Sequence, residues 1–394
     1  MKPQIWILFF FVSFSAVLGV LFTPALPGMA KDFNVSGDTA ELLISLFLFG
    51  YTFGQLIYGP IAKAKGRKPA IYTTSVLSIV GSLISLIAAY SLSFSLMLFG
   101  RIVAAIGSSG GLTLSFTLIT DTYSSLKAKK KISLILLSFG VLPSIAIFVG
   151  GYLTEILGWE SCFIAMLIYS IFVCLITCFL PETLLEKDHS HLKISKIVNT
   201  YKNKAKQGYL VLSGLLMGLS TATFYLFQAE GPFIGMDQIG LSAEEYGSWA
   251  SIPPFGMAIG SLLVSFVTYK LPYNISLATS ICLYFIISVI MLLAFSQGAI
   301  NTLTLFIPTL LLLILIISIY TNASAHALDV SRDKAHTSAF MQMTNLLVTS
   351  LAVFTLSIIK TSSSLLLPVM YVLDGIFMFV IFIFLLKMFK TKES

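Results

Sequence analysis

Long apolar runs recur from one end of this chain to the other, and they constrain its fold more than any other feature. A helix needs about 20 mainly apolar residues to cross the hydrocarbon core of a bilayer. We identify twelve such runs, at residues 5–24, 42–62, 70–90, 94–120, 132–156, 160–180, 209–231, 247–269, 273–296, 301–327, 337–360 and 364–388. The sequence therefore predicts an all-α membrane protein with twelve transmembrane helices.

The composition leaves no room for a soluble catalytic domain. Of the 394 residues, 57% are hydrophobic and only 10% are charged, whereas a soluble domain carries about 25% charged residues. The chain has no Gly-x-x-x-x-Gly-Lys-Ser/Thr loop for ATP, and its four cysteines all fall in apolar runs, as packing residues do. We therefore expect no enzyme, no metal centre and no cofactor.

The first apolar run has two interpretations. Lys2 precedes an apolar stretch from Ile5 to Phe22, which has the order of a signal peptide cleaved near Ala30. The run is long for such a peptide, and eleven further spans follow it. We expect it to be an uncleaved first helix.

A basic interruption divides the spans into two sets of six. It covers residues 181–207, between an N-terminal bundle at 1–180 and a C-terminal bundle at 208–394. Its cations are all lysines: Lys187, Lys193, Lys196, Lys202, Lys204 and Lys206. We expect two linked six-helix bundles joined by a cytoplasmic linker.

The loop charges predict the orientation. With a cytoplasmic N-terminus and twelve spans, nearly all of the 24 lysines and arginines lie on the cytoplasmic side, as the positive-inside rule requires. Only Lys31 and Lys360 fall outside, and Arg101 lies within a span. Both termini are then cytoplasmic. The net charge of +7 faces anionic lipid and indicates no nucleic-acid partner. Three tryptophans at span ends predict an interfacial aromatic belt: Trp6, Trp159 and Trp249.

The loop between spans two and three carries the most specific motif. Residues 59–69 read GPIAKAKGRKP, with two glycines around a turn and a basic cluster after the second. This stretch resembles the signature loop of the major facilitator superfamily, in which a glycine lets two helices approach and the arginine pairs with an acid ending the fourth helix. The resemblance implies a conformational gate made of Gly59, Gly66, Arg67, Lys68 and Asp121. The family usually has an acid where this chain has Lys63. The alternative is a basic loop that merely obeys the positive-inside rule.

Three further stretches resemble the same superfamily. Residues 101–111 read RIVAAIGSSGG, residues 143–153 read PSIAIFVGGYL, and residues 180–184 read LPETL at the end of span six. Their order is similar to that of the twelve-helix drug:proton antiporters of the Bcr/CflA type. The resemblance implies a bend in helix five at Pro143, Gly150 and Gly151. Those exporters commonly carry an acid late in helix one, where residues 17–23 of this chain have none.

Arg101 lies about eight residues into span four, where a charge is costly and therefore a candidate for function. The resemblance implies that helices one, four, seven and ten surround a central cavity, with Arg101 on its wall. There it would hold an anionic substrate group or modulate a nearby acid. The alternative is an arginine that bonds backbone carbonyls and holds helices together.

Two acids are candidates for proton binding, because burial favours the neutral form of a carboxyl group. Glu230 lies near the outer end of span seven, in an aromatic stretch with Phe224, Tyr225 and Gln228 that suits a bulky amphipathic substrate. Asp374 lies about ten residues into span twelve. Glu230 could instead be a solvated glutamate at a helix end, and Asp374 could bond a neighbouring helix.

We expect a secondary transporter that exports small organic or amphipathic compounds in exchange for protons, by alternating access between two bundles. It would work as a monomer in the bacterial inner membrane, with the proton gradient as its energy source. One alternative is the export or import of a single metabolite such as a siderophore. A remote one is a membrane-embedded transferase or sensor.

Overall fold

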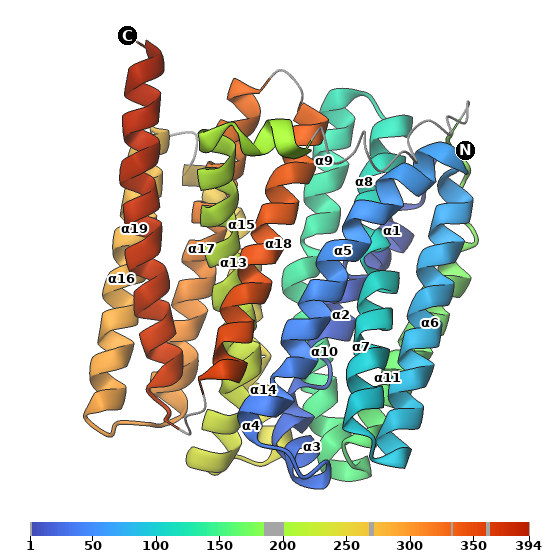
Figure 1. The fold of residues 1–394 in the computed structure, drawn as a ribbon, viewed down its shortest axis with the longest axis vertical. Coiled ribbons are helices and arrows are strands. Elements are labelled where there is room, and N and C mark those ends of the chain that lie inside the picture. The colour runs from blue at the N-terminus through green and yellow to red at the C-terminus, as the bar shows by residue number, and fades with distance from the viewer. Residues whose placement is uncertain (1, 185–200, 268–271, 332–333, 360–362, 394) are drawn as a thin grey trace. The chain divides into compact units, whose positions relative to one another are not determined.

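A computed structural model describes residues 2–184, 201–267, 272–331, 334–359 and 363–393. Within these residues the chain is helical nearly throughout and has no strand, as the apolar runs predicted (Figure 1). Most of the expected linker at 181–207 lies outside the described residues. The chain divides into two compact units, Met1–Ile197 with Ser242–Ser251, and Val198–Leu241 with Ile252–Ser394.

The first unit contains six helical crossings, several of them interrupted. Their elements, in chain order, are α1 (Ile5–Val12), α2 (Phe14–Val20), η1 (Thr23–Ala25) and α3 (Leu26–Asp32); α4 (Gly37–Ala40) and α5 (Leu42–Ala64); α6 (Arg67–Ser91); α7 (Phe94–Ser108) and α8 (Gly110–Thr122); α9 (Ser125–Leu136) and α10 (Ser138–Leu157); and α11 (Glu160–Thr177). A short helix from later in the chain, α14 (Ala243–Ala250), also belongs to this unit.

The second unit is built from longer helices. They are α13 (Gly208–Pro232), which continues into η3 (Phe233–Gln238), then α15 (Ile252–Val267), α16 (Tyr273–Ser296), α17 (Thr302–Val330), α18 (Lys334–Ile358) and α19 (Leu366–Glu393). Close packing joins α13 to α18, α17 and α19, and α16 to α17 and α19.

Eleven helices in the described part of the chain are long and apolar enough to cross a membrane. The described part of the remaining predicted span at 247–269 is formed by α14 and α15, which are separated at Ser251. Pro253 and Pro254 follow this break directly, because proline is tolerated in the first turn of a helix but not in its interior. The eighth span is therefore two helices instead of the single one expected.

In each unit, the start of the first helix and the end of the last helix lie on the same side of the helical bundle. In the first, the Lys2 ammonium lies 5.9 Å from the ring centroid of Tyr123, which follows the fourth crossing. Thr183, beyond α11, bonds Asp121 at that same end. In the second, a methyl group added to Gly208 at the start of α13 would lie 3.1 Å from Met388 near the end of α19. An even number of crossings in each unit follows, consistent with six and six.

Small residues bring helices together in both units. Methyl groups added to Gly81 or Gly107 of α6 and α7 would overlap the backbone of the facing helix. In the second unit, Gly214 and Gly218 of α13 lie against Thr344 and Val348 of α18. Glycines four residues apart on one helix face allow such a close helix contact.

The tryptophans do not form one belt. Trp6 is 52% exposed and Trp249 is 37% exposed, as interfacial residues are. Trp159 is only 5% exposed, and its indole Nε1 donates a hydrogen bond to Asp32 at 2.6 Å. The sequence prediction is wrong for Trp159, because an indole at a span end can also join two helix ends by a hydrogen bond inside the protein.

Candidate functional site

The turn between α5 and α6 is shorter than the motif suggested. α5 runs through Gly59 and Pro60 to Ala64, so only Lys65 and Gly66 lie between the two helices. Gly66 has a φ of +118°, which favours glycine. No atom lies within 4 Å of a methyl group placed on Gly59, so the expected close approach is not made there. It is made at Gly50 and Gly54, which contact the backbone of α7.

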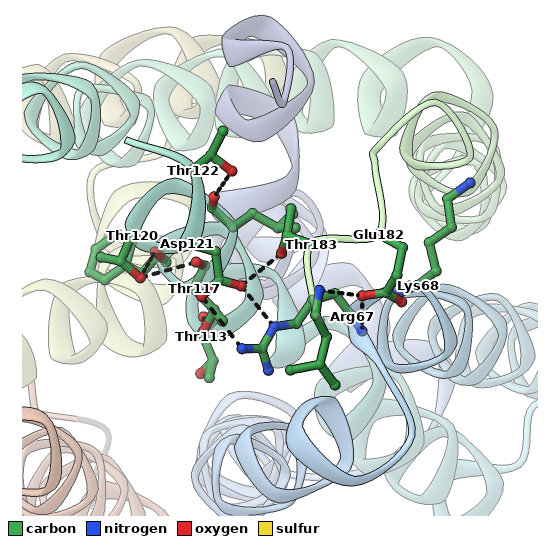
Figure 2. Close-up of polar contacts among 12 residues, drawn as sticks. Arg67, Lys68, Thr113, Thr117, Thr120, Asp121, Thr122, Glu182 and Thr183 are labelled. Carbon is green, nitrogen blue, oxygen red and sulfur yellow. Dashed lines mark hydrogen bonds and ion pairs between the residues drawn. The ribbon is translucent and has the colours of Figure 1, made fainter. Parts of the chain in front are cut away.

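Arg67 opens α6 and forms the ion pair that the motif predicted. Its Nε donates to Oδ2 of Asp121 at 3.0 Å, and a second guanidinium nitrogen lies 3.5 Å from Oδ1 (Figure 2). The Arg67 side chain is 8% exposed and that of Asp121 is 24% exposed. The pair thus joins the start of helix three to the end of helix four in a half-buried setting.

Two residues after α11 complete this cluster, and sequence reasoning gave neither a role. The Thr183 hydroxyl donates to Asp121 Oδ2 at 2.7 Å. The Glu182 carboxylate accepts the backbone N–H groups of Arg67 and Lys68, both at 3.0 Å. These N–H groups have no partner within α6, because the first turn of a helix lacks preceding carbonyls. We call Arg67, Asp121, Glu182 and Thr183 the helix-end cluster.

Glu182 is held in its charged form. Burial raises the pKa of its carboxyl group, but hydrogen bonds from the backbone of Leu184, Arg67, Lys68 and Thr183 outweigh burial and lower the pKa below its ordinary value. A methyl group on Gly66 would lie 2.7 Å from Glu182 Oε2. Glycine at position 66 therefore serves both the turn and the carboxylate beside it.

Arg101 of α7 is fully buried, and it contacts four residues of the first unit. One terminal nitrogen donates to the carbonyl of Leu18 at 2.7 Å, and Nε donates to the carbonyl of Leu43 at 3.4 Å. The guanidinium carbon lies 4.2 Å from the ring centroid of Phe22 and 4.3 Å from that of Phe47. These contacts hold helices one, two and four together, so they favour the structural interpretation over an open cavity wall.

The fifth span breaks before its predicted bend. α9 ends at Leu136 and α10 begins at Ser138, less than two turns before Pro143. A methyl group on Gly150 would overlap the carbonyl oxygen of Leu21 in helix one. Gly151 packs against Gly247 of α14, where an added methyl group would lie 2.8 Å from the facing Cα. The glycines thus serve close packing on two sides of α10.

α14 is fixed to α10 by a charge as well as by glycines. Glu155 Oε2 accepts the backbone N–H of Ala243, the first residue of α14, at 3.0 Å. Ser242 and Glu245 form a capping box at the same helix start. An acidic side chain at a helix N-terminus is favourable, and this contact explains why α14 belongs to the first unit.

The candidate substrate residues of α13 are all buried. Phe224 is 5% exposed, Tyr225 and Glu230 are 8% exposed, and Gln228 is fully enclosed. The rings of Phe224 and Tyr225 meet edge to face, with centroids 4.9 Å apart. Glu230 precedes Gly231 and Pro232, after which α13 changes into the π-helical η3. The structure therefore shows a buried glutamate, against the alternative of a solvated glutamate at a helix end.

Comparison with known proteins settles the family. The family model described as Major Facilitator Superfamily matches residues 5–353, which is most of the chain. The chain belongs to the Major Facilitator Superfamily. This confirms the resemblance seen in the loop motif, and the long apolar helices agree with the multi-pass membrane fold that it implied.

Relatives of this superfamily member include proteins named for drug resistance. A bicyclomycin resistance protein homolog of Haemophilus influenzae is 26% identical over 63% of this chain and 62% of its own length. The multidrug resistance protein MdtL of Salmonella paratyphi B is 27% identical over 77% of this chain and 76% of its own length. The chain spans about two thirds of the length of the curated relatives it matches, 66% in the case of an uncharacterized transporter of Rickettsia bellii.

A solved transporter shares the fold. The crystal structure of a D-xylose-proton symporter superposes with a TM-score of 0.77, covering 95% of this chain and 96% of that protein. The sequence identity is 12%, so this likeness concerns the fold alone.

In this superfamily member the remaining candidate, Asp374, lies in α19. Its side chain is 4% exposed, and its Oδ2 atom is enclosed without a hydrogen bond. Among the described residues, no group of three or more His, Cys, Asp or Glu side chains is placed to hold a metal ion. The charged candidate groups are thus the helix-end cluster, Arg101, Glu230 on α13 and Asp374 on α19.

Proposed function

We propose that this superfamily member exports small organic or amphipathic compounds in exchange for protons. The observation that carries the proposal is a buried carboxyl group, Glu230, on a helix lined with aromatic side chains. The names of two relatives, which concern resistance to bicyclomycin and to multiple drugs, support export of foreign compounds. The proton gradient is the proposed energy source, without a cofactor.

We propose that the protein works as a monomer in the bacterial inner membrane with both termini cytoplasmic. The lysine distribution supports this orientation, because the positive-inside rule is satisfied only by it. Bacterial relatives support the inner membrane. The helix-end cluster would then lie at the cytoplasmic ends of helices three, four and six.

The proposed mechanism assigns separate tasks to these groups. Glu230 takes up a proton when the site opens to the outside and releases it to the cytoplasm, which changes the charge that α13 must bury. Substrate occupies the aromatic face near Phe224 and Tyr225 in the deprotonated state. The helix-end cluster keeps the ends of its three helices together while the bundles rock, and Arg101 keeps helices one, two and four as one body.

Everted membrane vesicles test this proposal with ethidium as the transported cation. Addition of ethidium should release protons from energised wild-type vesicles. Glu230→Gln should abolish that release while the protein accumulates normally in the membrane. Glu244→Gln is the matched control, because Glu244 is an exposed acid at the start of α14. A Glu230→Gln variant with the pH dependence of the wild type would exclude Glu230 from the mechanism.

Transport of one specific metabolite, such as a siderophore, is the second candidate. It is favoured by the absence of an acid at residues 17–23, where drug exporters of the resembling type commonly carry one. It is also favoured by Lys63, where the superfamily usually has an acid. Vesicles that move none of a panel of cationic dyes, and whose transport of a single metabolite is indifferent to a proton gradient, would support it over drug export.

A further inference from the structure

Asp374 occupies a position in the second bundle where a charge has little support. It is the ninth residue of α19, about 12 Å along the helix at 1.5 Å per residue. Its side chain is more enclosed than that of Glu230, at 4% against 8% exposed. Its Oδ2 atom has no hydrogen-bond partner, and no ion pair to Asp374 is present among the described residues. Burying an unpaired ionised carboxylate costs several kcal/mol, so this environment favours the neutral acid.

Two tyrosines share this environment. Tyr371 precedes Asp374 by three residues on α19, so both side chains lie on one face of the helix. Tyr284 comes from α16, and both phenol groups lie within electrostatic range of the Asp374 carboxyl. The helices approach closely here, because a methyl group on Gly375 would lie 3.4 Å from the Tyr284 ring.

Both tyrosines bond to one residue of α13. The Tyr284 hydroxyl lies 2.8 Å from the Thr223 hydroxyl, and the Tyr371 hydroxyl donates to the Thr223 carbonyl at 3.2 Å. All three residues are fully buried. Of the two helices packed most extensively on α19, α16 thus presents the titratable Tyr284 and α13 presents the uncharged Thr223.

Thr223 lies on the same face of α13 as the proposed coupling acid. Glu230 follows it by seven residues, which is two helical turns. A change in the bonds at Thr223 therefore acts on the helix that carries Glu230.

We propose that Asp374 binds and releases a proton, and that Tyr371 and Tyr284 pass its change of charge to α13 at Thr223. On release, the O–H bond of the carboxylic acid breaks, the electron pair stays on the oxygen and the proton passes to water. The carboxylate then attracts the phenolic O–H of Tyr371, which exchanges its acceptor from the Thr223 carbonyl to Asp374. This inference rests on the proposed function only in its second part, the effect on transport.

The proton site is tested without any substrate. The full-length protein is placed in vesicles of phosphatidylethanolamine and phosphatidylglycerol, and the infrared C=O band of protonated carboxylic acids is followed from acidic to alkaline buffer. Asp374→Asn should remove a titrating band that both Asp374→Glu and Glu230→Gln retain. A band unchanged in Asp374→Asn overturns the proton site. A band that sodium chloride abolishes at constant pH, where potassium chloride does not, overturns the proton in favour of an alkali cation.

The link to α13 is tested through Tyr371. Tyr371→Phe should shift the titration of the Asp374 band and lower ethidium-driven proton release roughly tenfold, the factor that one hydrogen bond of ordinary strength supports. Tyr90→Phe is the matched control, because Tyr90 on α6 is 68% exposed. Wild-type behaviour of Tyr371→Phe overturns the link. An Asp374-dependent band in a wild-type protein that moves no protons with ethidium rejects proton-coupled export and leaves the proton site supported.

Discussion

Two buried arginines of the first bundle have fixed partners, whereas α16 and α17 of the second bundle are connected through uncharged groups. Arg67 pairs with Asp121, and Arg101 bonds two carbonyls between two aromatic rings. In the second bundle, the Asn322 amide of α17 donates to Ser276 of α16 at 3.1 Å, and Ser280 donates to Ser318 at 2.8 Å.

This difference indicates a division of labour. A charge that already has its partners gains nothing from changing protonation state, so it serves rigidity. A buried acid whose oxygen has no hydrogen-bond partner, such as Asp374, is favoured in its neutral form, so its protonation state depends on its surroundings. The first bundle is therefore the better candidate for a rigid scaffold, and the second for the response to protons.

The sharpest way to break this comparison is to remove Arg101. Arg101→Ala should lower stability by about 3 kcal/mol, because two buried carbonyls lose a charged donor and two rings lose their cation. Thermal unfolding of the purified protein measures the loss. Lys63→Ala, at an exposed position in the same bundle, is the control. If Arg101→Ala unfolds like the wild type but loses transport, the arginine is a substrate residue and the comparison fails.

The next largest effect concerns the Arg67–Asp121 pair. A double-mutant cycle with Arg67→Ala and Asp121→Asn should give a coupling energy of about 1 kcal/mol, the value expected for a half-exposed pair. Unfolding of the four proteins in one detergent measures it. Addition of Thr183→Val should reduce the coupling, since Thr183 donates to the same carboxylate oxygen. A coupling of zero would show that the pair does not join helices three and four energetically.

The neutral network of the second bundle should be weaker. Asn322→Leu is expected to cost about 0.6 kcal/mol, the average for a hydrogen bond between membrane helices. Thr355→Val is the control, because Thr355 bonds only the preceding turn of its own helix and is exposed. A cost as large as that of Arg101→Ala would mean that both bundles are equally rigid.

The smallest effect is a pH dependence at Glu182. Its folded pKa lies below the ordinary value of 4.5, so its contribution to stability is complete above that value and is lost as the pH falls through the folded pKa. The difference in stability between wild type and Glu182→Gln should be under about 0.5 kcal/mol after solvent screening. It should shrink steadily below pH 4.5. Glu244→Gln should show no such trend. A difference in stability that grows on acidification would contradict the conclusion that the Glu182 carboxylate stabilises the start of α6.

Sequence reasoning placed the helices well because their signal is local. Eleven predicted spans coincide with long apolar helices of the structure, and the Arg67–Asp121 contact followed from a motif that fixes both partners. The break at Ser251 was not predicted, because the surrounding apolar run is continuous, although Pro253 and Pro254 indicate it.

Contacts between distant helices could not be predicted in this way. The bond from Tyr371 to Thr223 depends on how α13 and α19 are rotated, and neither residue type is unusual in a membrane helix. Glu182 was noticed only as part of LPETL, because nothing local shows that the end of span six lies beside the start of span three. Arg101 had two interpretations from its depth alone, and only the carbonyls and rings around it separate them.

The placement of α14 has a consequence for dividing the protein into fragments. Ser242–Ser251 belongs to the first unit although α13 precedes it in the chain. A polypeptide severed in the basic segment after α11 would thus leave the amino-terminal fragment without the helix that packs on Gly151 and donates a backbone N–H to Glu155. We expect the amino-terminal fragment to need the carboxy-terminal one, which carries α14, to complete the first unit.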